Sequence, residues 1–356
     1  MPDPEPGDFA LFSCADDSRF VCEAELRAAL PELPPFLWLD ADADGEPVVA
    51  ALAALPLSFD ECAVVIERAA PIFLRHLAPV QETVALTGSL NDLDVMRAAV
   101  AALASRISAA HTASVQTRVH GDAPRPYNRA AVNRALWGEL TERTGATLDT
   151  RAPEQTLSVC VSADTAFLGV SWTRQNRSAW AGGERRFKRE PGQISRAEFK
   201  LLEAFEVFGI APPADGLALD IGAAPGGWTR VLRQKGMHVV AVDPADLAPA
   251  LERDHYVKHL RFPIQHYAPT DTFDLIVNDL KMDARDSIEV ILAMRPYLNA
   301  GGAAVITLKL PKHGETARSL LRYVRDDIAR LASRYRVLGA RQLFHNRSEI
   351  TVALGD

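Results

Sequence analysis

Residues Leu217–Asp243 read LALDIGAAPGGWTRVLRQKGMHVVAVD, and the pattern of this stretch decides the fold. Leu217–Ile221 is a short apolar run bounded by turn residues, which predicts a buried strand. A glycine-rich turn follows, and Trp228–Lys235 is typical of a helix that ends at Gly236. A second apolar run, His238–Val242, ends in an acid. This order of strand, turn, helix and strand predicts an α/β domain with a mostly parallel sheet.

The glycine-rich turn predicts a cofactor site. Glycines let the backbone approach a ligand closely, and the amino terminus of the following helix favours anionic groups. Asp243 ends the second strand about twenty residues later, where an acid can accept hydrogen bonds from ribose hydroxyls. A nicotinamide dinucleotide and S-adenosylmethionine both fit a unit of this kind.

Two residues favour S-adenosylmethionine over the dinucleotide. The dinucleotide fingerprint G-x-G-x-x-G needs a second glycine where this chain has Ala224. Asp220, just before the turn, would meet a pyrophosphate with like charge, whereas S-adenosylmethionine brings an ammonium and a sulfonium. The residues that we expect to hold this cofactor are Asp220, Gly222, Pro225, Gly226, Gly227, Trp228 and Asp243.

Length, composition and charge limit the number of domains and the class of protein. A chain of 356 residues with 48% hydrophobic residues can bury the cores of two or three domains. The sequence has no run of eighteen apolar residues and no signal peptide, so we expect a cytoplasmic protein without a membrane partner. Because the net charge is −7, any RNA-binding surface must be a local patch.

The cysteines predict neither a metal site nor thiol chemistry. Cys14, Cys22, Cys62 and Cys160 lack metal-ligand spacing, which is typical of reduced core thiols. All of them precede the glycine-rich stretch. This argues against cytosine C5-methylation through a cysteine adduct in the carboxy-terminal half.

The amino-terminal half predicts two small α/β modules. Residues 1–88 hold a strand and short helices that suggest no chemistry, and we assign them no function. Residues 89–183 predict a helix, a strand, a second helix and a hairpin around Ala163-Asp164. This order resembles a THUMP domain, an RNA-binding module of RNA-modifying enzymes. The alternative is a small packing domain.

A basic stretch separates these modules from the glycine-rich domain. Trp172–Lys200 carries an excess of Lys and Arg over Glu, with aromatic residues between them, and we place a linker at residues 184–194. Arginine on phosphate and aromatic rings on bases would make it an RNA track. A merely solvated linker is the alternative. The predicted RNA contacts are Arg118, Arg174, Arg177, Arg185, Arg186, Lys188 and Arg189.

Charged residues follow the predicted strands of residues 195–356. Asp279 ends one buried strand, Lys309 follows another and Glu349 begins the last, while Lys200 lies off the apolar stripe of the helix that Ser195 caps. The carboxyl ends of parallel strands are where open α/β sheets place chemistry. A [DNS]-P-P-[YFW] string, which would grip the amino group of a base, is replaced by N-D-L-K, which argues against N-methylation.

These strings resemble a known family. D-I-G-A-A-P-G-G-W-T resembles motif I of the FtsJ-like superfamily of RNA ribose 2'-O-methyltransferases. S-R-A-E-F-K, V-N-D-L, T-L-K-L-P and A-R-Q-L-F-H-N-R-S-E-I-T-V resemble the motifs of its RlmM type, which acts on large-subunit ribosomal RNA. The resemblance covers about residue 195 to the end and, more weakly, the chain from about residue 91.

The resemblance implies a fold and a site. The fold is a Rossmann-like class I methyltransferase domain whose mostly parallel sheet has a closing antiparallel strand, preceded by ferredoxin-like and THUMP-like domains. The site is a tetrad of Lys200, Asp279, Lys309 and Glu349. One departure is that the acid which the family carries after its third strand, at the adenine amino group, is missing from H-L-R-F-P-I-Q-H-Y. Backbone groups and Phe262 would then hold adenine.

The resulting hypothesis is 2'-O-methylation of RNA, with a cytidine of 23S ribosomal RNA as the implied target. Lys309 would be the base, and its pKa would have to fall by roughly two units, or about 3 kcal/mol, to serve at neutral pH. Burial and Lys200 lower that pKa, whereas Asp279 and Glu349 raise it, so the nearer group decides. A transfer RNA target, a non-catalytic ribosome-assembly factor and an NAD-dependent oxidoreductase stay open as alternatives.

Overall fold

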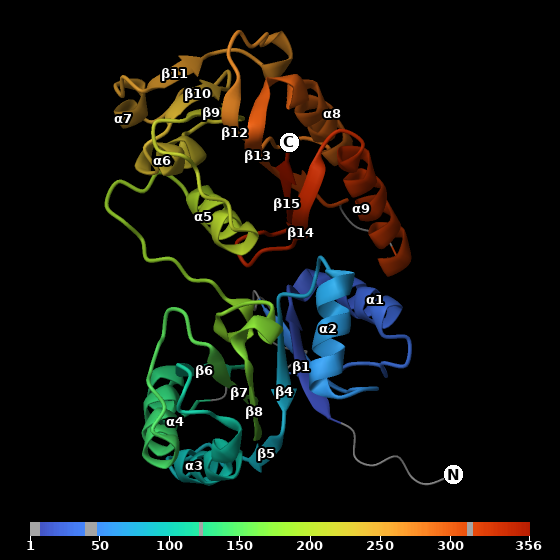
Figure 1. The fold of residues 1–356 in the computed structure, drawn as a ribbon, viewed down its shortest axis with the longest axis vertical. Helices are drawn as coiled ribbons and strands as arrows, with labels where there is room; N and C mark the ends of the chain where they lie inside the picture. Colours follow the sequence, from blue (N-terminus) through green and yellow to red (C-terminus); the bar gives the residue numbers. More distant parts are fainter. Residues whose placement is uncertain (1–7, 40–47, 121–123, 312–315) are drawn as a thin grey trace. The chain divides into compact units, whose positions relative to one another are not determined.

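The computed structural model describes residues 8–39, 48–120, 124–311 and 316–356. The chain divides into two compact units, with the boundary between Glu184 and Arg185 (Figure 1). Each unit has its own sheets and its own hydrophobic core. In the described residues, no helix has the length and hydrophobicity needed to cross a lipid bilayer.

The first unit begins with a four-stranded sheet. Its described elements are β1 Phe9–Cys14, α1 Arg19–Ala29, β2 Leu37–Leu39, β3 Val49–Ala54, α2 Phe59–Ala69 and β4 His76–Val80. The strand order is β2-β3-β1-β4, and every neighbouring pair is antiparallel. Helix α2 begins at Phe59 because Ser58 and Glu61 form a capping box, two residues before the possible helix start that the sequence indicates at Glu61.

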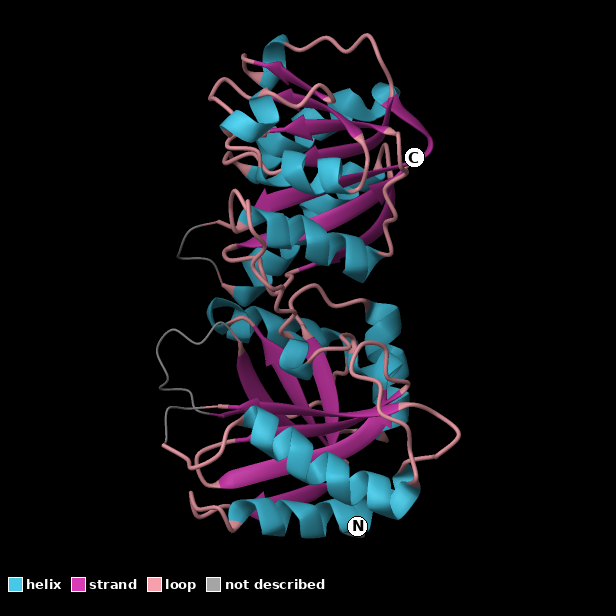
Figure 2. Ribbon diagram, turned by 90° about the vertical axis from the view of Figure 1, so that its left-hand side faces the viewer, coloured by secondary structure: helices cyan, strands magenta, loops and turns pink. Residues whose placement is uncertain are grey.

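A second four-stranded sheet completes the first unit (Figure 2). Its elements are β5 Glu82–Ala85, α3 Asp92–Leu103, β6 Ala113–Val119, α4 Arg129–Thr144, β7 Gln155–Val161 and β8 Thr165–Trp172. The strand order is β5-β8-β7-β6, with only β6 and β7 parallel among the described strands. Apolar residues of α3 and α4 pack against this sheet, and β7 and β8 form the hairpin that Ala163-Asp164 predicts.

The second unit is built on a seven-stranded sheet. Its strands are β9 Leu217–Ile221, β10 His238–Val242, β11 Val257–Leu260, β12 Phe273–Asn278, β13 Leu298–Lys309, β14 Arg336–Arg341 and β15 Glu349–Gly355. Their order is β11-β10-β9-β12-β13-β15-β14. The neighbouring pairs are parallel except where β15 lies antiparallel between β13 and β14. This confirms the predicted α/β class with a mostly parallel sheet.

Helices cover both faces of this sheet (Figure 1). They are α5 Ala197–Phe208, α6 Gly227–Gln234, α7 Pro249–Glu252, α8 Ala284–Met294 and α9 Ala317–Ala332. On one face, Leu201 and Phe205 of α5 pack with Val231 of α6 over Ala218 and Val277. Helices α8 and α9 lie side by side on the other. Burial on both faces explains why β9, β10 and β12 read as continuous apolar runs.

Side chains near the first turn explain where two helices of this unit begin. Helix α5 begins at Ala197 with Arg196 at the cap position, where the sequence predicts Ser195. Ser195 Oγ still accepts from the Ala197 N–H at 3.2 Å, and Glu198 accepts from the Ser195 N–H at 3.2 Å. Helix α8 begins at Ala284, ahead of the apolar run that starts at Ile288. The Asp283 side chain accepts from the Arg285 N–H and so caps the helix earlier than hydrophobicity indicates.

Candidate active site

Four charged residues meet at one edge of the seven-stranded sheet. Asp279 directly follows β12, Lys309 ends β13, and Glu349 begins β15. Because β15 runs antiparallel to its neighbours, its first residue lies at the edge where the parallel strands end. Lys200 comes to the same edge from α5.

Atom distances close these residues into a ring of alternating charge. Lys200 Nζ lies 2.6 Å from Glu349 Oε1 and 3.3 Å from Asp279 Oδ2. Lys309 Nζ lies 3.3 Å from Asp279 Oδ1 and forms an ion pair with Glu349 Oε2. Each ammonium thus contacts both carboxylates. Charge-assisted hydrogen bonds of this kind are about twice as strong as neutral ones.

The pKa of Lys309 moves opposite to what a base at neutral pH needs. Burial alone would lower it, but the carboxylates of Asp279 and Glu349 outweigh burial and raise it above its ordinary value. Burial alone would likewise raise the pKa of Glu349, but Lys200 and Lys309 outweigh burial and lower it. The sequence left open whether burial and Lys200 or the two acids would prevail; in this structure the acids prevail, because Asp279 and Glu349 both contact Lys309 Nζ.

Sequence reasoning missed two side chains that support the ring. Thr307 donates to Asp279 Oδ1 at 2.7 Å and accepts from Lys309 Nζ at 3.3 Å. Asn346 lies 3.4 Å from Glu349 Oε1 through its amide nitrogen. The spacing of Thr307 and Lys309 was a usable signal, because residues two apart on a strand face the same side.

A buried acid on α5 holds the loop that leads to Glu349. Glu203 is 4% exposed and accepts from the backbone N–H groups of Phe344 and His345 at 2.9 and 3.0 Å. Its Oε2 also lies 2.7 Å from His345 Nδ1. Helix α5 therefore contributes both Lys200 and the anchor for the segment before β15.

The glycine-rich turn lies between β9 and α6. Gly222 donates to the carbonyl of Val242 at 3.0 Å, and Pro225 is exposed. Gly226 has a φ of +108°, and a Cβ at this position would lie 2.2 Å from Leu251. A Cβ on Gly227 would lie 2.3 Å from Ser195 Oγ. Gly226 therefore requires glycine because of its positive φ, whereas a Cβ at Gly227 would need Ser195 to move.

The two predicted cofactor acids differ in exposure. Asp243 is half-buried after β10, and its carboxylate accepts from the Ala224 N–H at 3.1 Å and the Ala245 N–H at 2.8 Å. Asp220 is 1% exposed and accepts from the Thr229 hydroxyl at 2.6 Å. Burial raises the pKa of Asp220 to about 7, and the carboxylates of Asp279 and Asp243 add to this. Asp243 thus braces the turn, whereas Asp220 lies beneath it.

Trp228 packs between two helices. It is 3% exposed, and its indole N–H donates to the carbonyl of Ala197 at 2.8 Å. This ties the start of α6 to the start of α5, one turn before Lys200. Its surroundings are the hydrophobic cluster of α5, α6 and the sheet, so we remove Trp228 from the expected cofactor contacts.

The region after β10 contains an acid, Glu252, but it lies on α7 and not after the third strand, where the family carries its acid. His259 on β11 contacts Glu252 at 2.8 Å through Nδ1 and the carbonyl of Asp243 at 3.0 Å through Nε2. Glu252, which belongs to α7, also accepts from Arg261 at 2.7 Å. Phe262 is partly exposed beside this network. Glu252 was not predicted from the sequence, because it precedes β11 rather than following it.

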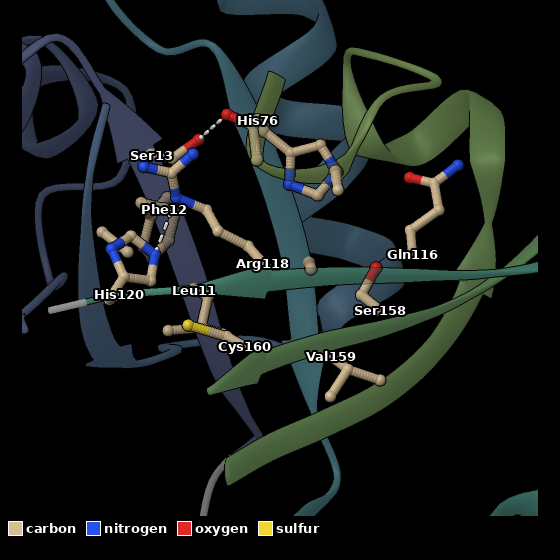
Figure 3. Close-up of a pocket in the computed structure, with 14 residues that line it drawn as sticks. Leu11, Phe12, Ser13, His76, Gln116, Arg118, His120, Ser158, Val159 and Cys160 are labelled. Atoms are coloured by element: carbon tan, nitrogen blue, oxygen red, sulfur yellow. Dashed lines mark hydrogen bonds between the residues drawn. The ribbon is translucent and has the colours of Figure 1, made fainter. Parts of the chain in front are cut away.

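Arg118 does not fit the predicted contact with phosphate. It is 8% exposed in the first unit, where it donates to His120 at 2.9 Å and pairs with Glu184 and the carbonyl of Val48. Figure 3 shows it in a cavity of about 390 Å³, part of it open to solvent, which residues of both four-stranded sheets line. A guanidinium with these partners is an internal link between elements of the first unit.

The other predicted cations divide into two groups. Arg177 donates to the carbonyl of Pro71 at 2.8 Å, and Arg185 lies 3.9 Å above the Phe187 ring while pairing with Glu206 at 2.6 and 2.7 Å. These two are engaged within their own units. The cations that face solvent are Arg174, Arg186, Lys188 and Arg189.

Comparison with known proteins gives the domain a family. The family described as FtsJ-like methyltransferase matches residues 193–320. The chain is 36% identical over 181 residues to Ribosomal RNA large subunit methyltransferase M of Halorhodospira halophila, across 49% of this chain and 51% of that protein. It is 33% identical over 245 residues to the protein of that name in Stenotrophomonas maltophilia, across 66% and 64%.

A third relative, from Azotobacter vinelandii and of the same name, is 33% identical over 225 residues, across 60% of this chain and 62% of that protein. The chain thus spans between about half and two-thirds of the length of these curated relatives. The range matched by the family includes the glycine-rich turn, Lys200, Asp279 and Lys309. The match of residues 193–320 to the FtsJ-like methyltransferase family thus covers most of the domain that carries this site.

Proposed function

We propose that this chain methylates a ribose 2'-hydroxyl of RNA with S-adenosylmethionine as methyl donor. The observation that carries the proposal is the closed ring of Lys200, Asp279, Lys309 and Glu349 at the carboxyl edge of the sheet. The glycine-rich turn follows β9, a strand that pairs directly with β12, which leads to Asp279. The names of the relatives favour large-subunit ribosomal RNA, and the family resemblance favours a cytidine.

The residues around the glycine-rich turn fit the methyl donor. When bound, S-adenosylmethionine supplies a methyl group on a positive sulfur, which then leaves as a neutral thioether. Gly226 and Gly227 keep the backbone free of side chains at the turn. Asp243 is accessible to ribose hydroxyls, and the ionised form of Asp220 is favoured by a nearby positive charge. Among these residues, Gly222 and Pro225 complete the turn.

Lys309 is the group that we assign to take the hydroxyl proton. A ribose hydroxyl is a weak acid, so a base beside it must remove the proton as the oxygen attacks the methyl carbon. Glu349 and Asp279 orient the lysine, and Lys200 balances their charge. Because the two acids raise the pKa of Lys309, only a small fraction of the amine is neutral at pH 7. We therefore expect the rate of methylation to rise with pH above neutrality.

The amino-terminal half is assigned to RNA binding in this proposal. A ferredoxin-like module in residues 1–88 and a THUMP-like module in residues 89–183 would precede the linker at residues 184–194 and the catalytic domain at residues 195–356. The exposed cations are the candidates for phosphate contacts, namely Arg174, Arg186, Lys188 and Arg189. Arg118 and Arg177 are left out because their guanidinium groups are engaged inside the first unit. The cell compartment we assign is the cytoplasm.

Mapping of 2'-O-methyl sites tests the proposal. RNA from cells with and without the gene is compared, and the purified chain is then offered the unmodified RNA with labelled S-adenosylmethionine. We expect one site in large-subunit ribosomal RNA to disappear and to be restored in vitro. Loss of a transfer RNA site instead would identify transfer RNA as the substrate. Loss of no site would overturn the proposal.

Calorimetry separates the remaining alternatives. S-adenosylmethionine should bind and NAD should not. A chain that binds RNA and S-adenosylmethionine but leaves every RNA, including precursor ribosomal particles, unmethylated would be an assembly factor rather than an enzyme.

A further inference from the structure

Thr307 contacts two members of the charged ring, although it is not one of the four predicted tetrad residues. It is on β13, two residues before Lys309, so both side chains face the same side of the sheet. Its exposed fraction is 1%. Burying a hydroxyl costs free energy unless it forms hydrogen bonds. The hydrogen-bond partners of Thr307 are Asp279 and Lys309 of the charged ring.

Both hydrogen-bonding roles of the hydroxyl are in use. Thr307 donates to Asp279 Oδ1 at 2.7 Å and accepts from Lys309 Nζ at 3.3 Å. The same Oδ1 lies 3.4 Å from Lys200 Nζ and 3.3 Å from Lys309 Nζ. The threonine bond is therefore the shortest contact of that carboxylate oxygen within the ring. This bond has the distance of an ordinary O–H···O hydrogen bond, whereas both ammonium groups lie farther from Oδ1 than about 3.2 Å.

We propose that Thr307 is a positioning residue for the proposed base. Its hydroxyl keeps the Asp279 carboxylate from moving closer to Lys309 Nζ, so that Glu349 remains the principal partner of Lys309. The inference rests on the proposed function only in giving Lys309 the role of base. The arrangement of Thr307, Asp279 and Lys309 does not depend on which RNA is the substrate.

The position of Asp279 affects the pKa of Lys309, because Lys309 lies among three other charged groups. Asp279 faces it from the end of β12, Glu349 from β15, and Lys200 from α5 across the two acids. A carboxylate free of Thr307 could move closer to the lysine. Shortening a charge pair by about 0.5 Å changes the pKa of the lysine by roughly half a unit to one unit. Without the hydroxyl, less neutral amine would be present at any pH.

Trace acetylation measures the neutral amine directly. At pH 8 the labelling rate of Lys309, read by mass spectrometry, is compared with that of exposed Lys188 in the same sample. Thr307→Val removes the hydroxyl and keeps the shape, and we expect Lys309 to label about three to ten times more slowly. Thr307→Ser keeps the hydroxyl and should stay within twofold of the wild type.

Two further variants make the result specific. Thr117→Val changes a buried threonine of β6 whose hydroxyl has no partner among the described residues, and it should leave the labelling of Lys309 unchanged. Thr307→Ala also lacks the hydroxyl and must repeat the effect of Thr307→Val. In an Asp279→Asn background, Thr307→Val should no longer slow the labelling, because the carboxylate that it releases is gone.

Methylation gives the second readout. We expect Thr307→Val to lower kcat at pH 8 by the same factor with KM unchanged, and a rise of one pH unit to restore it. Equal or faster labelling in Thr307→Val, or equal slowing in the Asp279→Asn background, would overturn the role of Thr307. If the labelling changes as expected but no RNA is methylated by the wild type, the proposed function fails and the positioning role stands.

Discussion

Lys309 and Glu349 lie directly opposite each other on the antiparallel strands β13 and β15. Side chains at such positions share a face of the sheet, with Cβ atoms about 5 Å apart. The register alone therefore brings the ammonium and the carboxylate into contact. A slip of one residue would turn Glu349 to the other face and open the ring.

Replacement of Lys309 by alanine should abolish methylation without loss of RNA binding. A general base contributes roughly 10²–10⁴-fold to a rate, and we expect kcat to fall by that factor. Lys309→Arg keeps the charge but cannot release its proton, so it should be equally inactive. Methyl transfer and electrophoretic mobility shifts measure the two properties. Wild-type kcat in either variant would remove Lys309 from its proposed role.

Protonation of Glu349 should make the protein less stable at low pH. Because its pKa is lower in the folded chain than in the unfolded one, its stabilising effect is present above the unfolded pKa and is lost as pH falls through the folded pKa. Glu349→Gln should lower the free energy of unfolding at pH 7 by about 1–3 kcal/mol, with a shallower decline below pH 5. Urea unfolding at several pH values measures this. If the unfolding free energies of the wild type and Glu349→Gln fell in parallel with pH, the lowered pKa of Glu349 would be contradicted.

Asp220 should have the opposite pH dependence. Its pKa is about 7 in the folded chain, above the unfolded value, so the native state binds the proton more tightly and stability falls as pH rises from about 4 to 7. Asp220→Asn removes this penalty and can still accept from Thr229. The variant should be a few kcal/mol more stable than the wild type at pH 8 and equal to it at pH 4, as measured by denaturant unfolding. A constant difference at both pH values would speak against the raised pKa.

Glu203 should affect both stability and turnover. Its carboxylate holds two backbone N–H groups and His345, so Glu203→Ala should cost about 2–4 kcal/mol in unfolding free energy. We expect kcat to fall while the affinity for S-adenosylmethionine stays the same, because the loop that it anchors leads to Glu349. Glu206→Ala, on the same helix and exposed, is the matched control and should change stability by less than about 1 kcal/mol. Unchanged kcat in Glu203→Ala would mean that Glu349 is positioned without this anchor.

Trp228 should affect packing rather than cofactor binding. Trp228→Phe removes the hydrogen bond to the Ala197 carbonyl and leaves a small cavity, so unfolding free energy should fall by about 1–3 kcal/mol. The dissociation constant for S-adenosylmethionine, measured by calorimetry, should stay within twofold. A tenfold loss of affinity would return Trp228 to the cofactor site.

Some elements were hidden from sequence reading because their patterns are weak. Strand β3 reads VAALAA, which has no alternation of polar and apolar residues, and β4 contains Pro79 in its interior. Neither was predicted, although together they make up half of the first four-stranded sheet. Both strands are buried, and it is the contacts with β1 that make them strands.

Most elements of the carboxy-terminal α/β domain and the charged residues at its strand ends follow from the sequence alone. Local periodicity, turn chemistry and the direction of parallel strands are enough for that. The tertiary structure placed β15 between β13 and β14 and set its register, which puts Glu349 opposite Lys309. It also decided the direction of the pKa shift of Lys309 and the inward position of Arg118. Both depend on the distances between charged groups far apart in the chain, and no local pattern encodes those distances.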